Sequence, residues 1–181
     1  AETSGGVPRD EASRLARARA AITPRATARI FFTSGSTGAP KGVPLSYDVL
    51  SRSSAQALYM HRDMPREPLV MLDWLPWSHA FAGLGNLGRL FTLGGSYFID
   101  DGRPLAGQFQ RTLENLREVE PTVYATVPAA WAQLSTALAS DAQLAQAFFR
   151  RLRYVSYGGA SLPRDVWERI QTVRSEEHTS E

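Results

Sequence analysis

The segment from Thr33 to Gly42 combines small hydroxyl-bearing residues, glycines and Lys41, the only lysine among 20 basic residues. Such a segment can turn several backbone N–H groups toward one point, where an anionic oxygen cluster accepts them and the ammonium group offsets the charge. The pattern predicts a phosphate-binding loop; the alternative is a flexible surface turn. It is not a Walker A loop, because that motif needs Gly-Lys followed by Ser or Thr, and here Pro40 precedes the lysine and Gly42 follows it.

Two other stretches carry residues suited to ligand binding. His79 follows a Trp-Leu-Pro-Trp turn, and its imidazole could donate a hydrogen bond to a developing oxyanion or to phosphate. The alternative is a hydrogen-bonded histidine at the start of a helix. Gly158 and Gly159 could let a planar base lie against the backbone, or could form a turn that leads into a helix. Trp74 and Trp77 are predicted to pack rather than to touch substrate.

Two clusters of charged residues are interpreted structurally. Asp100 and Asp101 end a predicted strand before Gly102, and adjacent strand residues point to opposite faces, so the pair is predicted to form a turn rather than a catalytic site. The arginines at positions 150, 151 and 153 are typical of a solvated helix end, where the helix dipole favours cations.

The elements that must position these residues alternate along the chain. Alternation of strands with helices of ten to fifteen residues predicts an α/β fold, a parallel sheet with helices on both faces, in which strand, helix and strand form the first unit. Ligands then bind beyond the carboxyl ends of the strands, so we expect the site in the loops after Thr33, Leu75, Val127 and Tyr157. The expected strands span 27–33, 69–75, 96–99, 122–127 and 153–157, and the expected helices span 10–21, 46–60, 81–93 and 105–119 and follow Pro128, Asp141 and Pro163.

The composition of the 181 residues, 43% hydrophobic and 21% charged, is that of an ordinary folded domain. The absence of Cys excludes disulfides, a thiol nucleophile and a Cys-based metal site. The 20 basic residues are scattered, which argues against a nucleic-acid face. No apolar run reaches the roughly 18 residues of a membrane helix, so we expect no membrane span and a cytoplasmic protein.

The run FTSGSTGAPKG, from Phe32 to Gly42, resembles the phosphate-loop signature of the adenylate-forming (AMP-binding) superfamily. Two further stretches are similar to the family in the right order: 73–83, DWLPWSHAFAG, and 157–163, YGGASLP. Between them, 124–128, YATVP, is similar to the strand that reaches the acyl tunnel. The wording of 74–81, WLPWSHAF, 97–104, YFIDDGRP, and 115–128, NLREVEPTVYATVP, resembles the feruloyl-CoA synthetase branch of the acyl-CoA synthetases most closely.

The resemblance implies the large N-terminal domain of an enzyme that joins a carboxylic acid to ATP, with Mg²⁺, and passes the acyl group to coenzyme A. It implies catalytic roles for His79 and Lys41. It also implies an aryl-acid site formed by His79, Phe81, Tyr124, Thr126 and Gly158. Contacts with the nucleotide are implied for Thr33, Ser34, Gly35, Ser36, Thr37, Gly38, Lys41, Gly158, Gly159 and Ala160.

Several alternatives stay open at this point. A medium-chain fatty acid could replace ferulate as the substrate, and a carrier-protein thiol could replace coenzyme A. A kinase or another nucleotide hydrolase is disfavoured by the failed Walker match. A nucleotide-binding fragment without catalysis is the alternative from a different class. The sequence does not disclose the oligomeric state.

Parts of the family pattern are absent from these 181 residues: the acidic Tyr-Gly-x-Thr-Glu segment, the ribose-binding Asp and the C-terminal domain with its catalytic Lys. Residues 174–181, RSEEHTSE, resemble the translation of a sequencing adapter and are expected to interrupt the last helix as a non-native tail. We therefore expect a helical segment over 1–25, a partial AMP-binding domain over 26–173 and a fragment that is inactive by itself.

Overall fold

The structure is a computed structural model that describes residues 9–33, 39–60, 62 and 67–179. It divides into two compact units, residues 1–52 and 53–181, which are described separately. In the first unit, helix α1 (Arg9–Ala20) precedes strand β1 (Thr27–Thr33), strand β2 (Lys41–Ser46) and the start of helix α2 (Tyr47–Met60).

Strands β1 and β2 form an antiparallel pair. Their register places Thr33 opposite Lys41 and Thr27 opposite Ser46. The β-branched and aromatic residues of β1 favour an extended chain, and Phe31 is buried. At the end of β2, Ser46 caps α2, because its Oγ accepts a hydrogen bond from Val49 N at 3.4 Å.

The β1–β2 hairpin differs from the predicted arrangement of strand, helix and strand at the start of the chain. Strand 27–33 forms as expected, but it pairs with β2 instead of joining the parallel sheet. The sequence reading placed residues 41 and 42 in the loop and did not find a strand over 41–46. Gly42 and Pro44 explain the omission, because both residue types are depleted in strands and proline is tolerated only where its missing N–H is not needed.

The second unit is built on a parallel sheet of order β4-β3-β5-β6. This confirms the predicted α/β class with a parallel sheet. The strands are β3 (Leu69–Asp73), β4 (Gly95–Ile99), β5 (Val123–Thr126) and β6 (Tyr154–Tyr157). The helices are the π-helix η1 (Phe81–Asn86), α3 (Leu87–Leu93), α4 (Phe109–Val119), α5 (Pro128–Ser140), α6 (Ala142–Arg150) and α7 (Arg164–Thr179).

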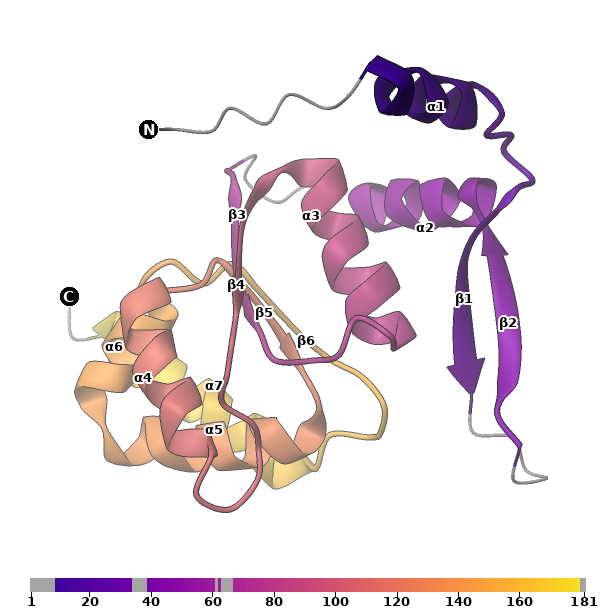
Figure 1. The fold of residues 1–181 in the computed structure, drawn as a ribbon. Coiled ribbons are helices and arrows are strands. Elements are labelled where there is room, and N and C mark those ends of the chain that lie inside the picture. The colour runs from indigo at the N-terminus through magenta and orange to yellow at the C-terminus, as the bar shows by residue number, and fades with distance from the viewer. Residues whose placement is uncertain (1–8, 34–38, 61, 63–66, 180–181) are drawn as a thin grey trace, which may run out of the picture. The chain divides into compact units, whose positions relative to one another are not determined.

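Helices cover the two faces of the sheet unequally. Helices α4, α5, α6 and α7 lie together on one side, and α3 lies on the other (Figure 1). The larger core joins Leu72 and Tyr124 of the sheet to residues of α4–α7, with Trp131 and Phe148 among its largest buried side chains. Because side chains alternate across a strand, Met71 and Val123 point to the opposite face and form a smaller core beside Tyr97.

The helix boundaries differ from the sequence prediction in three places. The expected helix 81–93 is a π-helix followed by an α-helix, and Leu87 N donates to Ala82 O, five residues back. Helix α4 begins at Phe109 rather than at residue 105. Helix α7 continues to Thr179, so residues 174–179 extend it instead of interrupting it. Among the side chains whose burial is described, Val173 is the last buried one of α7, and the polar residues 174–176 after it lie outside the core.

Candidate functional site

The predicted phosphate loop is closed by the β1–β2 pair. Thr33 and Lys41 face each other in the register, and Thr33 Oγ1 lies 3.5 Å from Lys41 O. Both residues are exposed, so their side chains are accessible at the loop end of the hairpin. The predicted nucleotide-binding residues Ser34, Gly35, Ser36, Thr37 and Gly38 lie outside the described residues.

Three of the predicted loops leave the same edge of the parallel sheet. Asp73 ends β3, Thr126 ends β5 and Tyr157 ends β6, with Thr126 opposite Tyr157 in the register. Trp74 connects two of these ends, because its Nε1 donates to Thr126 Oγ1 at 3.1 Å. The arrangement confirms that Trp74 packs, and it places the buried Thr126 hydroxyl behind the indole rather than on an open surface.

His79 lies on a short, well-defined turn at this edge. Its backbone N donates to Pro76 O at 3.0 Å, and its carbonyl accepts from Gly83 N at 2.7 Å. The turn is held from the side by Trp77, whose ring meets Tyr97 edge-on with 6.1 Å between centroids. The side chain of His79 is exposed, so a ligand at the sheet edge could reach the imidazole.

Phe81 and Gly158 are brought into direct contact, although 77 positions separate them in the chain. A Cβ atom on Gly158 would lie 3.3 Å from Phe81 Cε1, so the aromatic ring rests on the glycine backbone. Gly159 has a φ of 89°, a conformation that favours glycine, and an added Cβ would lie 3.9 Å from Val127 Cγ1. The end of β6 therefore leads into a segment with little side-chain bulk, Gly158–Ala160, beside η1 and the end of β5. We call this segment the Gly158–Ala160 shelf; its last residue, Ala160, is exposed.

Tyr124 occupies a different place from the one implied by the resemblance. It is 1% exposed, and its ring packs edge-on against Trp131 and Phe148, with 5.4 Å between centroids in each pair. A ring enclosed by α5 and α6 is not available to an acid in this conformation. Side chains alternate across a strand, so Tyr124 points to the face covered by α4–α7 and its neighbours in β5 point to the other face. This is why Tyr124 lies in the core and not at the predicted acid site.

A buried carboxylate that the sequence reading did not single out lies next to His79's turn. Asp73, 4% exposed, accepts hydrogen bonds from Leu75 N at 2.8 Å, Asn86 Nδ2 at 2.7 Å and Tyr97 Oη at 2.5 Å. Burial raises the pKa of Asp73, while the hydrogen bonds from Tyr97, Asn86 and Leu75 act in the opposite direction. In the sequence, only the position of this Asp directly after the apolar run 69–72 could have indicated a functional carboxylate.

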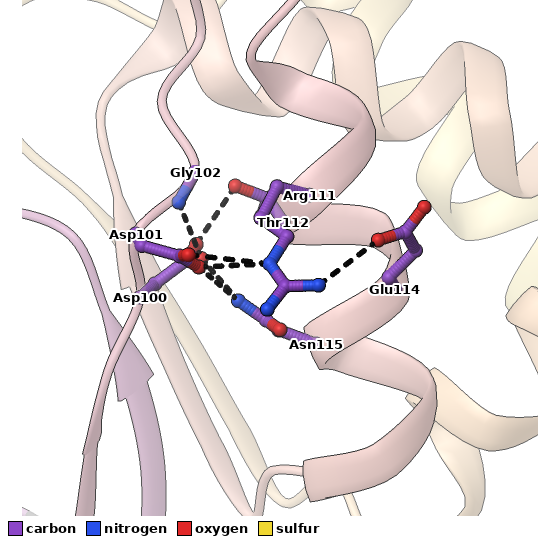
Figure 2. A network of polar contacts seen from close by, with 7 residues as sticks. All are labelled: Asp100, Asp101, Gly102, Arg111, Thr112, Glu114 and Asn115. Atoms are coloured by element: carbon purple, nitrogen blue, oxygen red, sulfur yellow. Dashed lines mark hydrogen bonds and ion pairs between the residues drawn. The ribbon is translucent and has the colours of Figure 1, made fainter.

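A second carboxylate cluster lies directly after β4, where the sequence predicted a turn with Asp100 and Asp101 on opposite faces. Asp100 is buried and accepts from Gly102 N, Thr112 Oγ1 and Asn115 Nδ2 at 2.9, 2.7 and 2.7 Å (Figure 2). Asp101 accepts from the same Asn115 amide at 3.0 Å and pairs with Arg111 (Figure 2). The two carboxylates meet at one place because both follow the strand, where the alternation of faces no longer applies.

The described residues contain no group of three or more His, Asp or Glu side chains placed to hold a metal ion. Within the same residues, no helix has the length and apolar character needed to cross a membrane.

The α/β architecture with its parallel sheet matches that of the N-terminal domain of adenylate-forming enzymes. The structure is similar to a malonyl-CoA ligase in a ternary product complex with methylmalonyl-CoA and AMP, with a TM-score of 0.65 and 26% identity over 86% of this chain and 32% of that one. It is also similar in fold to McyG A-PCP complexed with phenylalanyl-adenylate, with a TM-score of 0.67 and 18% identity over 88% of this chain and 28% of that one.

The model of the family described as AMP-binding enzyme matches residues 2–179, and the chain therefore belongs to that family. Among curated relatives, the long-chain-fatty-acid–CoA ligase ACSBG2 of Gallus gallus is 33% identical over 120 residues, which is 65% of this chain and 15% of that protein. The ligase ACSBG1 of Homo sapiens is 33% identical over 107 residues, 58% of this chain and 14% of that protein. The chain thus spans about one seventh of the length of these relatives.

Proposed function

We propose that the enzyme containing this chain activates a carboxylic acid with ATP and then forms a thioester with coenzyme A. In the first step, a carboxylate oxygen attacks the α-phosphorus, the bond to the β-phosphate oxygen breaks, and acyl-adenylate and pyrophosphate result. In the second step, the thiol of coenzyme A displaces AMP. The observation that carries the proposal is the Thr33–Gly42 motif, closed by Thr33 opposite Lys41, in a chain of the AMP-binding enzyme family.

The hairpin end is suited to the triphosphate. Attack of a carboxylate on ATP brings two anions together and expels a third, so positive charge and donors must gather around the phosphates. Lys41 and the Thr33 hydroxyl supply such groups at the two ends of the loop, and the residues between them add hydroxyl and backbone donors. When bound with the nucleotide, Mg²⁺ supplies further charge neutralisation on the phosphate oxygens.

The sheet edge in the second unit is suited to the acyl and adenine groups. We assign His79 to the border of the reacting carboxylate, where a donated hydrogen bond stabilises developing negative charge. Phe81 forms the apolar wall of the acid site, and the Gly158–Ala160 shelf receives the flat adenine ring. The contact between Phe81 and Gly158 supports a shared acid and adenine site, because one ring and one backbone segment then border both groups.

The acid is proposed to be a hydroxycinnamate such as ferulate, on the basis of the resemblance of 74–81, 97–104 and 115–128 to the feruloyl-CoA synthetase branch. Fatty acids are the second candidate, since the names of the curated relatives specify long-chain fatty acids. We also propose that the enzyme is located in the cytoplasm.

The test is pyrophosphate release by the intact enzyme that contains this chain, with ferulate, octanoate, palmitate or no acid. We expect release to depend on an acid and thioester to form once coenzyme A is added. Phosphate release without any acid would indicate a hydrolase, and ATP binding without pyrophosphate would indicate a non-catalytic nucleotide-binding protein; either result refutes the proposal. The most active acid decides between ferulate and fatty acids.

Lys41→Ala tests the hairpin directly. One ammonium–phosphate contact at 4 Å is worth about 1 kcal/mol in water and about 4 kcal/mol at a half-buried site. The adenylation rate should therefore fall by a factor between about 5 and about 1,000. Arg52→Ala is the matched control, because it removes another exposed cation of the same unit, one that pairs with Asp48 on α2. Equal rates in the Lys41→Ala variant and the wild type would remove Lys41 from the site.

A further inference from the structure

The carboxylate of Asp73 connects three segments of the second unit. Its Oδ1 accepts from Leu75 N, at the beginning of the turn that carries His79. Its Oδ2 accepts from Asn86 Nδ2, at the last residue of η1, and from Tyr97 Oη on the neighbouring strand β4. We propose that Asp73, Asn86 and Tyr97 form a positioning network that sets the placement of His79 for acid activation. This inference rests on the proposed role of His79.

The network holds the His79 segment from both ends. Leu75 lies four residues before His79 and Asn86 seven residues after it, and both donate to the same carboxylate. Between them, the backbone of His79 is bonded only to its own segment, through Pro76 O and Gly83 N, among the bonds between described residues. The hydrogen bonds of the His79 backbone therefore stay within the segment, and Asp73 connects that segment to the end of β3.

Tyr97 adds a second restraint. Its hydroxyl donates to Asp73, and its ring meets Trp77, two residues before His79. Because β4 is paired with β3 through Asp73 opposite Ile99, Tyr97 itself is held by the sheet. A single tyrosine thus connects the carboxylate, the sheet and the turn.

Packing alone does not account for a carboxylate at this position. Asp73 is 4% exposed, and replacing a buried polar network by apolar groups of similar shape is often neutral or stabilising. What the carboxylate provides is geometry, because each of its two oxygens receives a donor from a different segment. Its contribution should therefore be visible in the placement of His79 as well as in the stability of the fold.

The chain offers a close internal control for this proposal. Asp100 is also buried and also follows a strand, and it accepts from a backbone N–H two residues later, from one hydroxyl and from one asparagine amide (Figure 2). These partners tie the end of β4 to α4, on the opposite face of the sheet from η1 and α3. Asp100→Asn thus changes a similar carboxylate that has no hydrogen bond to the His79 segment within the described part of the chain.

The experiment compares Asp73→Asn, Tyr97→Phe and Asp100→Asn in the intact enzyme. The first readout is amide hydrogen exchange over residues 74–86, which should become faster in the Asp73 and Tyr97 variants and stay unchanged in the Asp100 variant. The second readout is acid-dependent pyrophosphate release. We expect kcat to fall about 10- to 100-fold in the Asp73 variant, since a small displacement of a positioned group has effects of this size. Tyr97→Phe keeps the ring and is the milder variant if Asp73→Asn does not fold.

The decisive comparison repeats Asp73→Asn in a His79→Ala background. A network that acts through His79 should have little further effect once the imidazole is gone, so the loss of kcat should shrink to less than about threefold. An equal loss in both backgrounds, or an equal loss in Asp100→Asn, overturns the inference, as does unchanged exchange over 74–86. A wild type without acid-dependent pyrophosphate release overturns the proposed function instead, and the exchange data then still decide whether Asp73 holds the segment.

Discussion

Replacing Tyr124 or Tyr97 by phenylalanine removes the same hydroxyl group, but we expect opposite effects on the free energy of unfolding. Tyr124→Phe deletes a hydroxyl that is buried and has no hydrogen-bond partner among the described residues. Burial, with smaller contributions from the charges of Asp100 and Asp73, raises the pKa of this hydroxyl, so the group is neutral at pH 7. Tyr97→Phe deletes a hydroxyl that donates to the buried carboxylate of Asp73 at 2.5 Å. Both changes leave the aromatic ring in place.

The magnitudes follow from these surroundings. A buried hydroxyl without a partner costs about 1–3 kcal/mol, so its removal should raise the free energy of unfolding by about that amount. A hydrogen bond to a charged group contributes about 1.5–3 kcal/mol, so Tyr97→Phe should lower the free energy of unfolding by about that amount. For a chain of this size, 1 kcal/mol corresponds to a change in Tm of roughly 2–4 °C. The packing of Tyr124 against Trp131 and Phe148 should persist, because phenylalanine keeps both edge-on contacts.

Urea denaturation followed by tryptophan fluorescence measures both changes. We expect the midpoint of Tyr124→Phe above that of the wild type and the midpoint of Tyr97→Phe below it. Tyr59→Phe, at a position 69% exposed, is the control for loss of a hydroxyl in water and should have little effect. A Tyr124→Phe midpoint at or below the wild-type value would refute the reasoning, since the hydroxyl would then have a stabilising partner.

Three further predictions concern other parts of the second unit. Leu134→Ala, at a fully buried core position, should cost about 2–5 kcal/mol of unfolding free energy, whereas the exposed Leu105→Ala should change it by less than about 0.5 kcal/mol; equal urea midpoints would contradict this. Gly102→Ala should lower Tm, because the new Cβ would lie 2.2 Å from Thr112 Oγ1 and 2.5 Å from Thr112 N, and a tolerated alanine would show that this turn can shift. Asp141→Asn should destabilise the protein at neutral pH, since hydrogen bonding by Leu144 N and Arg117 lowers the pKa of Asp141. That contribution is present above the ordinary aspartate pKa and is lost as pH falls through the lowered value, so the urea midpoints of variant and wild type should converge in acid; a constant difference would exclude the charge as its source.

The sheet and its helices could be predicted because each element is long enough for its own pattern to be clear. The apolar run 69–72 and the turn residues around it predict a buried strand, and Asp141 predicts the start of α6 through its capping side chain. Partner choice could not be read in the same way. Residues 27–33 favour a strand, but nothing local specifies whether its neighbour is β3 or the weakly patterned segment 41–46.

The candidate site was predicted unevenly for a similar reason. A short motif identifies residues such as His79, and the resemblance implies their roles. It does not specify the face of a strand on which a side chain lies, and Tyr124 was therefore assigned to the ligand while the structure places it in the core. The network of Asp73 was missed because its members are separated by 13 and 24 positions, and only the fold brings them together.

The wide turn of η1 takes up about one residue more than an ordinary α-helical turn of 3.6 residues. If one residue of 81–86 were deleted, the segment could close as an α-helix, and α3 would keep nearly the same orientation because the extra residue is confined to the wide turn. A deletion inside α3 has no such relief, since the residues that follow it would rotate by about 100° around the helix axis. Loss of one residue should thus be tolerated more readily in η1 than in α3.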